Sequence, residues 1–366
     1  MKKIKADLLI IGAGSGGLVV ASGAAQLGAN VVLVEGDRMG GDCLNYGCVP
    51  SKALLAAANT AKQVNQSDKF GIKAKIVDLD YAGVMTYVEK KIAEIAPHDS
   101  QERFEEMGVT VLRDYAKFKD PKTVVVGNNE ITARRIVLAT GSRAKIPNIE
   151  GLNKVNYLTN ESVFDLRKSP RHLAIICGGP IGVEMAQAHA RLGIKTTIIE
   201  INRIMQGYER RFVEPVHKSL IDDGVNILEG TVVDRVENDR SNIKLHLSSA
   251  STLVVSDLLI AAGRAPNIEK LALTEAGIKY NDLGVIVDRN LQTTNRSVYA
   301  IGDIVDGPSF THTASYHAGI VLKKTLFGLS STIQTTHIPQ VTYTDPEIAS
   351  VGLNFNDAVK RFGNKV

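Results

Sequence analysis

A strand–turn–helix pattern occurs twice in this sequence and decides much of its fold. In the first copy an apolar run at residues 8–11 is followed by a glycine-rich turn at 12–17 and an alanine-rich helix that ends near Gly28. A second apolar run at residues 31–34 then ends on an acid, Glu35. The turn carries G-x-G-x-x-G at Gly12, Gly14 and Gly17, and Glu35 follows 23 residues after the first glycine. Such glycines let backbone N–H groups approach a pyrophosphate, and the acid accepts hydrogen bonds from a ribose. The pattern therefore predicts a dinucleotide-binding βαβ unit.

The same pattern recurs 165 residues later. An apolar run at residues 173–176 is followed by a turn at 177–182 and a helix that ends near Gly193. A second apolar run at residues 196–199 ends on Glu200. Gly179, Gly182 and Glu200 repeat the residue types of the first copy at the same spacing. Two nucleotide sites in one chain indicate two cofactors that exchange electrons.

The second copy differs at its first position, where Cys177 replaces a glycine. That glycine serves the tight turn. One interpretation is that the small cysteine is tolerated there in a β-like conformation. The other is that its Cβ strains the loop or holds the phosphate further away, which would weaken or abolish nucleotide binding.

Two cysteines, Cys43 and Cys48, lie just downstream of the first copy, in the segment GGDCLNYGCVPSK. A disulfide needs Cα atoms roughly 4.4–6.8 Å apart, whereas residues five apart on a regular helix are about 7.5 Å apart along its axis. The pair can form only if the backbone between them is irregular, and Gly47 supplies that freedom. Zinc needs about four ligands, and the one other cysteine is distant in sequence. A redox-active disulfide is the prediction, and no metal site is expected.

The composition is that of a soluble globular protein. Two or more domains are expected, because 366 residues are too many for one ordinary hydrophobic core. The net charge of +4 is mild and basic residues are not concentrated, so no nucleic-acid partner is expected. The N-terminus enters a strand at once, without the features of a secretory signal, and no run approaches the roughly 18 apolar residues of a membrane span. We therefore expect a cytoplasmic protein.

With these motifs, the chain from residue 6 to about 352 resembles the class I flavin disulfide reductases, the pyridine nucleotide-disulfide oxidoreductase family. Three further segments share the resemblance. Residues 139–142 are similar to the segment that returns the chain from the FAD domain, and residues 261–267 to the segment that leaves the NAD(P) domain. Residues 300–303 are similar to the second FAD motif. Residues 49–52 are closer to the lipoamide and mercury branches, those of dihydrolipoamide dehydrogenase and mercuric reductase, than to the glutathione branch.

The resemblance implies an α/β fold with two Rossmann-like nucleotide-binding domains of three ββα layers, and a truncated α+β dimerisation domain. The expected ranges are 1–147 and 268–335 for a discontinuous FAD-binding domain, 148–267 for the NAD(P)-binding domain, and 336–366 for the start of the dimerisation domain.

The resemblance also assigns site residues. The FAD site would be formed by Gly12, Gly14, Gly17, Glu35, Gly41, Lys52, Ala116, Thr140, Gly141, Ser142, Asp303 and Thr311. The NAD site would be formed by Gly179, Ile181, Gly182, Glu200, Val233, Gly263 and Arg264.

Catalytic roles follow from the same resemblance. Cys48 would be the thiolate next to the flavin, and Cys43 would exchange with the substrate disulfide. Lys52 would stabilise the thiolate–flavin region, and Glu184 would be its partner. NAD is expected over NADP because the Glu200 carboxylate repels a 2′-phosphate, although Arg203 lies near enough in sequence to assist one.

The family forms a homodimer through its last domain, which also supplies a catalytic histidine in a His-Pro-Thr setting. Residues 343–352 resemble the opening of that domain, but none of the eight histidines has that setting. His312 and His317 are expected either to pack within the flavin domain or to support the residues that contact the flavin. The stub at 338–353 would then present unpaired strand edges.

The leading hypothesis is an FAD-dependent, NAD(P)H-linked disulfide oxidoreductase nearest to dihydrolipoamide dehydrogenase, acting on a small-molecule or protein-bound dithiol. A mercuric reductase is the alternative in substrate. A diaphorase, in which NADH reduces the flavin and the flavin reduces a small acceptor, needs no base from a partner subunit. An inactive remnant is the fourth hypothesis, motivated by Cys177 and the missing domain.

Overall fold

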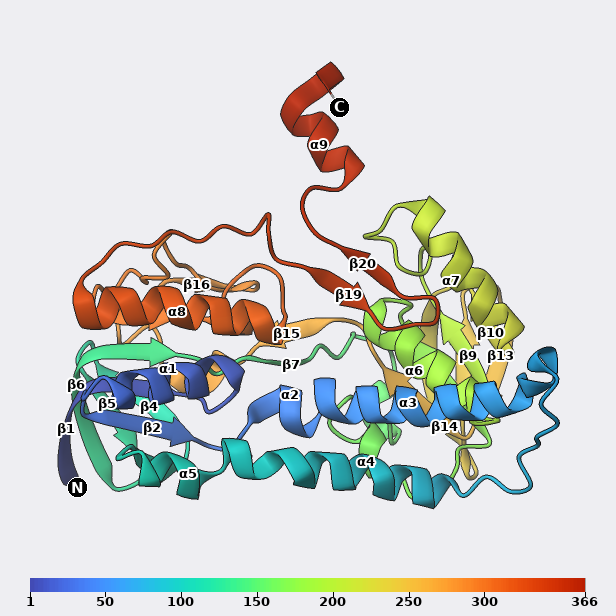
Figure 1. Ribbon diagram of the computed structural model, residues 1–366, viewed down its shortest axis with the longest axis horizontal. Coiled ribbons are helices and arrows are strands. Elements are labelled where there is room, and N and C mark those ends of the chain that lie inside the picture. The colour runs from blue at the N-terminus through green and yellow to red at the C-terminus, as the bar shows by residue number, and fades with distance from the viewer. Residues whose placement is uncertain (366) are drawn as a thin grey trace. The chain divides into compact units, whose positions relative to one another are not determined.

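The computed structural model describes residues 1–365 and divides the chain into two compact units. Unit 1 contains residues 1–45, 92–143 and 264–338. Unit 2 contains residues 46–91, 144–263 and the chain from 339 onward. Each unit therefore holds one of the two glycine-rich turns (Figure 1).

Unit 1 is built on a seven-stranded sheet with strands in the order β3-β2-β1-β6-β5-β4, and β18 also pairs with β6. The strands of this sheet are β1 (Lys2–Ile11), β2 (Val31–Glu35), β3 (Thr110–Arg113), β4 (Ala116–Asp120), β5 (Thr123–Val126), β6 (Asn129–Leu138) and β18 (Val298–Ala300). Strands β3, β2, β1, β6 and β18 pair in parallel, whereas β4, β5 and β6 form an antiparallel meander.

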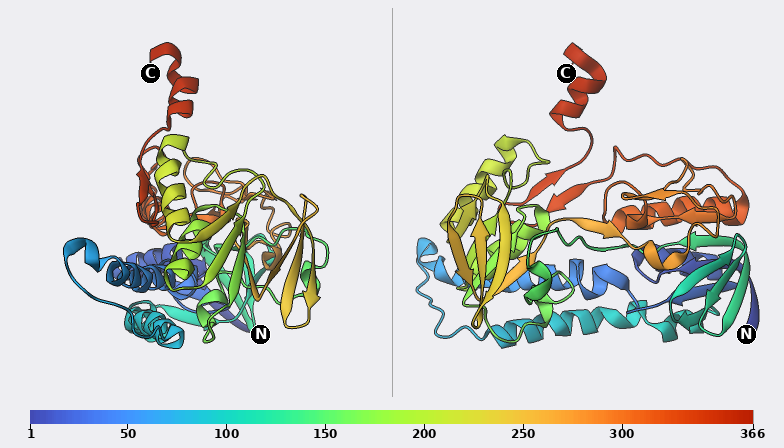
Figure 2. Two further views of the ribbon diagram at one scale, coloured as in Figure 1. Left: turned by 90° about the vertical axis from the view of Figure 1, so that its right-hand side faces the viewer. Right: turned by 180° about the vertical axis from the view of Figure 1, so that it is seen from behind.

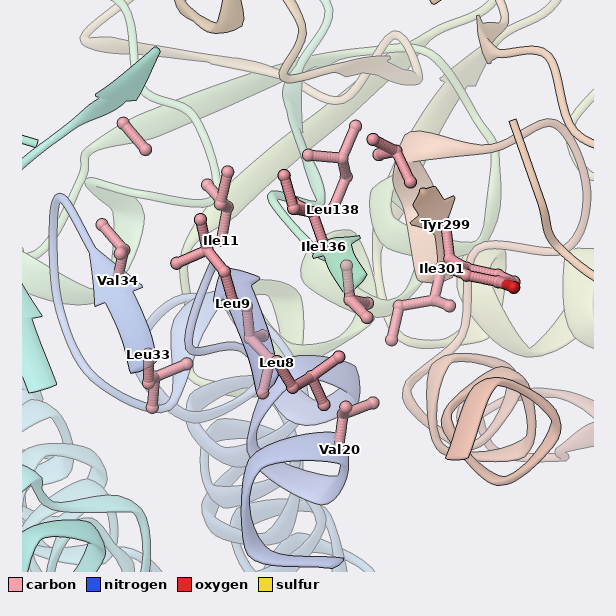
Figure 3. Packing of buried hydrophobic residues seen from close by; sticks show 14 of the residues in the cluster. Leu8, Leu9, Ile11, Val20, Leu33, Val34, Ile136, Leu138, Tyr299 and Ile301 are labelled. Atoms are coloured by element: carbon pink, nitrogen blue, oxygen red, sulfur yellow. The ribbon is translucent and has the colours of Figure 1, made fainter. Parts of the chain in front are cut away.

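The core of unit 1 lies around the parallel strands. Leu8 to Ile11 on β1 are all buried, as are the apolar residues of β2 beside them. A parallel strand covered on both faces reads as a continuous apolar run, and this explains the uninterrupted Leu-Leu-Ile-Ile. Figure 3 shows side chains of β1, β2 and β6 packed together, with Val20 of helix α1 beneath them.

Helices and short strands complete unit 1. They are α1 (Ser15–Gln26), α2 (Gly41–Asn45), α5 (Gln101–Glu106), α8 (Thr311–Phe327), β15 (Arg264–Pro266), β16 (Tyr280–Asn281) and β17 (Gly284–Val285). Helices α1 and α8 contact each other along their length, and β16 pairs with β17. Strand β15 pairs with β7 (Ser142–Ala144), a strand in which the chain leaves unit 1.

Unit 2 is built on a four-stranded parallel sheet with the order β10-β9-β8-β14. A separate antiparallel sheet, β11-β12-β13, shares one buried apolar cluster with residues of the parallel strands β8, β9 and β14. The strands are β8 (His172–Ile176), β9 (Lys195–Ile199), β10 (Val225–Leu228), β11 (Val233–Asp239), β12 (Asn242–Leu247), β13 (Thr252–Val255) and β14 (Asp257–Ile260). Figure 2 shows the antiparallel sheet in yellow.

The helices of unit 2 include one long helix that begins at the second cysteine of the pair. They are α3 (Cys48–Asn65), α4 (Tyr81–Ile95, whose last turn lies in unit 1), α6 (Pro180–Arg191), α7 (Arg210–Asp222) and α9 (Phe355–Phe362). Helix α3 packs against α6, and apolar residues of both helices share one buried cluster with β8 and β9.

The packing units differ from the predicted domain ranges in residues 46–91. The sequence places this segment in the FAD-binding range 1–147, whereas it packs within unit 2. The physical reason is the apolar face of α3, where Leu54, Ala58 and Ala61 are buried in the cluster that also contains Val183 and Ala186 of α6.

The chain after residue 338 forms a hairpin of β19 (Gln340–Thr342) and β20 (Ile348–Ser350), followed by α9. The hairpin lies beside α6 (Figure 1), and α9 projects beyond it in every view (Figure 2). No residue of α9 is buried. Among the described residues, no helix is both long and apolar enough to cross a membrane.

Candidate active site

The turn between β1 and α1 depends on its glycines for both conformation and space. Gly12 has a φ of +107°, and a Cβ there would lie 2.3 Å from the carbonyl oxygen of Ala139. A Cβ at Gly17 would lie 1.9 Å from the carbonyl oxygen of Gly12. Neither position can hold a side chain without moving the backbone, so the tight turn that was predicted is built by close packing.

Glu35 at the end of β2 is held by the backbone of this turn. Its Oε2 accepts a hydrogen bond from the Ala13 N–H at 2.6 Å, and its Oε1 accepts one from the Asp37 N–H at 2.8 Å. Each carboxylate oxygen keeps a further lone pair. The carboxylate is therefore fixed in orientation and can still accept hydrogen bonds from a ligand.

The turn between β8 and α6 in unit 2 repeats this geometry. Glu200 accepts from the Gly178 N–H at 2.7 Å and from the Asn202 N–H at 2.9 Å. A Cβ at Gly182 would lie 2.0 Å from the carbonyl oxygen of Cys177, the counterpart of the Gly17 contact. The second fingerprint thus has the same loop conformation as the first.

The interpretation that Cys177 adopts a β-like conformation is wrong. Its φ is +86°, in the left-handed region that its counterpart Gly12 also occupies. The loop imposes this angle because Gly182 packs on the Cys177 carbonyl group. A residue with a Cβ adopts such an angle at a cost of roughly 1–2 kcal/mol. Burial, together with the Glu200 carboxylate, raises the pKa of the Cys177 thiol, although the Gly179 N–H opposes the shift.

A second glycine of unit 1 is also replaced in unit 2. Gly40 has a φ of +85° and donates its N–H to the carbonyl oxygen of Ala13. Its counterpart Met205 has a φ of +53° and donates to the carbonyl oxygen of Gly178 at 2.8 Å. Sequence analysis missed this position, since a lone methionine carries no signal of a left-handed conformation.

Both turns fit a dinucleotide. Gly14 and Gly179 are the N-cap residues of α1 and α6, and no side chain within residues 1–365 caps either helix. The first N–H groups of α1, and those of α6 that follow Pro180, which has none, are therefore available to an anion at the positive end of the helix dipole. A Cβ at Gly41 would lie 2.7 Å from the Cα of Gly14, so two backbones meet beside the first cradle.

A charged cluster in unit 1 surrounds the second FAD motif. Ser142 Oγ donates to Asp303 at 2.8 Å, and the Arg264 Nε donates to Ser142 Oγ at 2.6 Å. Arg264 Nη2 lies 3.0 Å from the carboxylate of Asp42, the neighbour of Cys43 in sequence. Burial raises the pKa of Asp303, while Ser142 and Arg264 oppose that shift and Asp42 adds to it. Arg264, which the sequence assigns to the NAD site, thus contacts residues of the FAD motifs.

The other predicted FAD residues also lie in unit 1, apart from Lys52. Thr140 donates its hydroxyl to the carbonyl oxygen of Asn267 at 2.8 Å, and Gly141 has a φ of +66°. Thr311 begins α8. Ala116 is buried in the core at the start of β4, so only its backbone can contact a ligand.

The remaining predicted NAD residues lie in unit 2. Ile181 is exposed in the first turn of α6. Val233 begins β11 and is buried in the cluster of the antiparallel sheet. Gly263 is the last residue before the chain returns to unit 1 and has a φ of +94°.

The two cysteines lie on successive helices. Cys43 is half-buried on α2, and Cys48 is exposed as the first residue of α3. The helical path stops between them, and Gly47 precedes α3 with φ −124° and ψ −106°, which confirms the predicted irregular backbone. The first residue of a helix lies at the positive end of its dipole, a position that favours a thiolate. The boundary between the two units falls within this segment.

Lys52 and Glu184 are brought together within unit 2. Lys52 Nζ on α3 lies 2.9 Å from Glu184 Oε2 on α6. The Glu184 side chain is 7% exposed and that of Lys52 is 38% exposed. A buried carboxylate needs such partners to remain charged.

The two histidines near the second FAD motif serve packing or local hydrogen bonding. His317 is buried, and its Nδ1 accepts from the Gly302 N–H at 3.2 Å. Burial lowers the pKa of His317 to about 4, which keeps the ring neutral as this bond requires. His312 stacks on Phe310. Within the described chain no group of three or more metal-ligating side chains is found.

The family "Pyridine nucleotide-disulphide oxidoreductase" matches residues 6–318, and the chain belongs to it. This confirms the family and the α/β fold class expected from the sequence. The predicted cofactor classes, FAD and NAD(P), also agree with the family.

Relatives include enzymes of two branches. The chain is 33% identical over 360 residues to a mercuric reductase of Lysinibacillus sphaericus, covering 97% of this chain and 66% of that protein. It is 34% identical over 359 residues to a dihydrolipoyl dehydrogenase of Geobacillus stearothermophilus, covering 95% of this chain and 76% of the relative. The chain thus spans only part of the curated relatives that it matches.

A solved structure has the same fold over nearly the whole chain. The HOCl-induced flavoprotein disulfide reductase RclA from Escherichia coli superimposes with a TM-score of 0.87 at 27% identity. The match covers 97% of this chain and 79% of that structure.

Proposed function

We propose that this protein is an FAD-dependent, NAD(P)H-linked disulfide oxidoreductase of the dihydrolipoyl dehydrogenase type. The observation that carries the proposal is the pair of equivalent nucleotide cradles, one in each unit, in a chain where Cys43 lies on α2 and Cys48 is the first residue of α3. Membership of the family supports it.

In the proposed reaction, one NAD(P)H, one proton and one disulfide yield NAD(P)⁺ and two thiols, so two electrons pass through the chain. FAD, when bound, supplies the acceptor that takes up the hydride and returns the electron pair to the disulfide. The turn at Gly12–Gly17 and the Glu35 carboxylate would hold it, together with Asp303 of the second FAD motif.

The residues of the chain have separate roles in this proposal. Cys48 supplies the thiolate stabilised at the helix N-terminus, and Cys43 exchanges with the substrate dithiol or disulfide. Lys52, paired with Glu184, provides the positive charge beside the thiolate. Glu200 binds the ribose of the nicotinamide nucleotide, and we infer NAD rather than NADP because a buried carboxylate repels a 2′-phosphate.

An anaerobic visible spectrum, recorded before and after addition of NADH, tests the proposal. We expect a yellow protein that develops a long-wavelength thiolate–flavin charge-transfer band. The band should be lost in the Cys48→Ser variant. A colourless protein, or a band that persists in Cys48→Ser, would contradict the assignment.

Reduction of Hg(II) is the second candidate, favoured by the mercuric reductases among the relatives. Two thiolates are soft ligands suited to such an ion. NADH oxidation that depends on Hg(II) but not on lipoamide would select this function. A homodimer and a cytoplasmic location stay predictions from the sequence.

A further inference from the structure

The chain that follows β19 is bound by side chains of α6. The N–H of Tyr343 donates to Glu184 Oε1 at 2.8 Å, and the N–H of Asp345 donates to Gln187 Oε1 at 2.7 Å. Alternate residues of an extended chain direct their N–H groups to the same side. Acceptors three residues apart on a helix lie on one face, so the two elements match.

This contact is reinforced around Asp345. Gln187 Nε2 donates back to the Asp345 carbonyl oxygen at 3.1 Å, and Arg191 Nη2 lies 2.9 Å from the Asp345 carboxylate. Burial alone would raise the pKa of Asp345, but Arg191 and Lys62 outweigh it and hold that pKa below its ordinary value.

Glu184, Gln187 and Arg191 form one buried polar face of α6. Buried polar groups are costly unless they are hydrogen-bonded. The segment 343–345 supplies partners to all three side chains. It is therefore held in one place on the helix.

Tyr343 also contacts Lys52 with its ring. The Lys52 ammonium lies 4.3 Å from the centroid of the Tyr343 ring and 2.9 Å from Glu184 Oε2. Because Glu184 Oε1 is taken by the Tyr343 N–H, the orientation of the carboxylate is fixed and Oε2 is directed to Lys52. One residue thus holds both members of the ion pair, Glu184 by its backbone and Lys52 by its ring.

We propose that Tyr343 is a positioning residue for Lys52, with its ring as the second support of the ammonium beside the Glu184 carboxylate. The purpose of a fixed Lys52 rests on the proposed function, since that function requires a cation beside the Cys48 thiolate. The contact itself is independent of any cofactor.

The test compares Tyr343→Leu with Tyr343→Phe, which keeps the ring. Reductive methylation of the purified protein, followed by mass spectrometry of each lysine, measures how freely the Lys52 amine moves and reacts. We expect Tyr343→Leu to speed methylation of Lys52 by about two- to fivefold, the factor that corresponds to a cation–π contact at a partly exposed site. Tyr343→Phe should leave the Lys52 methylation rate as in the wild type. Glu184→Gln should raise that rate further than Tyr343→Leu does.

Tyr87→Leu is the matched control, because Tyr87 has similar exposure and also lies under a lysine, Lys91, at 5.5 Å. It should leave Lys52 unaffected. Equal Lys52 rates in Tyr343→Leu and the wild type, with a raised rate in Glu184→Gln, would overturn the proposal. An equal rise of the Lys52 methylation rate in Tyr343→Leu and Tyr343→Phe would also overturn the proposal, since the ring would then have no part.

A second measurement separates this inference from the proposed function. If the protein binds flavin, the charge-transfer band should weaken in Tyr343→Leu and be retained in Tyr343→Phe. If the wild type shows no flavin and no band, the proposed function fails, whereas the methylation pattern still decides the role of Tyr343.

Discussion

The two nucleotide-binding turns share one backbone conformation but reach it with different residues. Unit 1 uses Gly12 and Gly40 at its two left-handed positions, and unit 2 uses Cys177 and Met205. In the first turn the Ala139 carbonyl oxygen fills the space where a Cβ at Gly12 would lie, whereas the second turn has room for the Cys177 side chain. At the first position glycine is therefore favoured by both the backbone angle and the lack of space in unit 1, but by the angle alone in unit 2, where a cysteine is accommodated.

The largest effect is expected from giving the first turn the residue of the second. Gly12→Cys should destabilise unit 1 by about 2–5 kcal/mol, because left-handed strain adds to overlap with the Ala139 carbonyl. Urea unfolding followed by circular dichroism measures the loss. A variant as stable as the wild type would show that the two turns differ in sequence only.

Met205→Gly makes the second turn resemble the first and should also destabilise. Met205 is 2% exposed, so its removal leaves a cavity that outweighs the relief of a positive φ. We expect a net loss of about 1–3 kcal/mol. Unfolding midpoints for Met205→Gly and Met205→Leu separate the cost of the cavity from the cost of the positive φ, since Leu fills the cavity but keeps the strained angle.

Cys177→Gly should stabilise unit 2 by about 1 kcal/mol, because the strain of the left-handed angle exceeds the added entropy of glycine in the unfolded chain. We also expect tighter NADH binding by calorimetry. Cys177→Ala is the control, since it keeps a Cβ at the same angle and should not be stabilised. Equal stability of the Gly and Ala variants would mean that the angle carries no cost.

The smallest effect concerns the reactivity of Cys177. Because its pKa is raised, mainly by burial, its thiolate forms only at a pH above that of an ordinary thiol. In a Cys43→Ser/Cys48→Ser variant, where Cys177 is the only remaining cysteine, alkylation by iodoacetamide should be slower at pH 8 than that of a free thiol. The alkylation rate should rise with pH through a midpoint higher than that of a free thiol. Addition of NADH should lower the alkylation rate. A pH profile like that of a free thiol would contradict the raised pKa.

The local parts of the fold could be predicted from the sequence. The strands and helices around both turns follow from continuous apolar runs and from glycine chemistry, which act over a few residues. The interruption between Cys43 and Cys48 followed from disulfide geometry in the same way. The ion pair of Lys52 and Glu184, 132 residues apart, was expected only through resemblance to the family.

The rest depends on packing between distant segments. Nothing near Met205 in the sequence indicates its left-handed angle or the hydrogen bond from its N–H to the Gly178 carbonyl oxygen. Tyr343 and Glu184 are 159 residues apart, so their hydrogen bond has no local signal. The spacing of Glu184, Gln187 and Arg191 did place three polar side chains on one face of a helix, and that pattern could have predicted a buried polar partner.

Helix α6 serves two contacts with two different parts of itself. Its first turn, after Pro180, would offer N–H groups to the proposed nucleotide, and its side binds segment 343–345. Because a helix is a rigid rod, a slide of one residue moves every side chain by about 1.5 Å and turns it by about 100°. Both contacts would break together under such a slide. The register of α6 is thus locked along its flank, and an insertion between Gly179 and Glu184 would shift the first turn relative to segment 343–345.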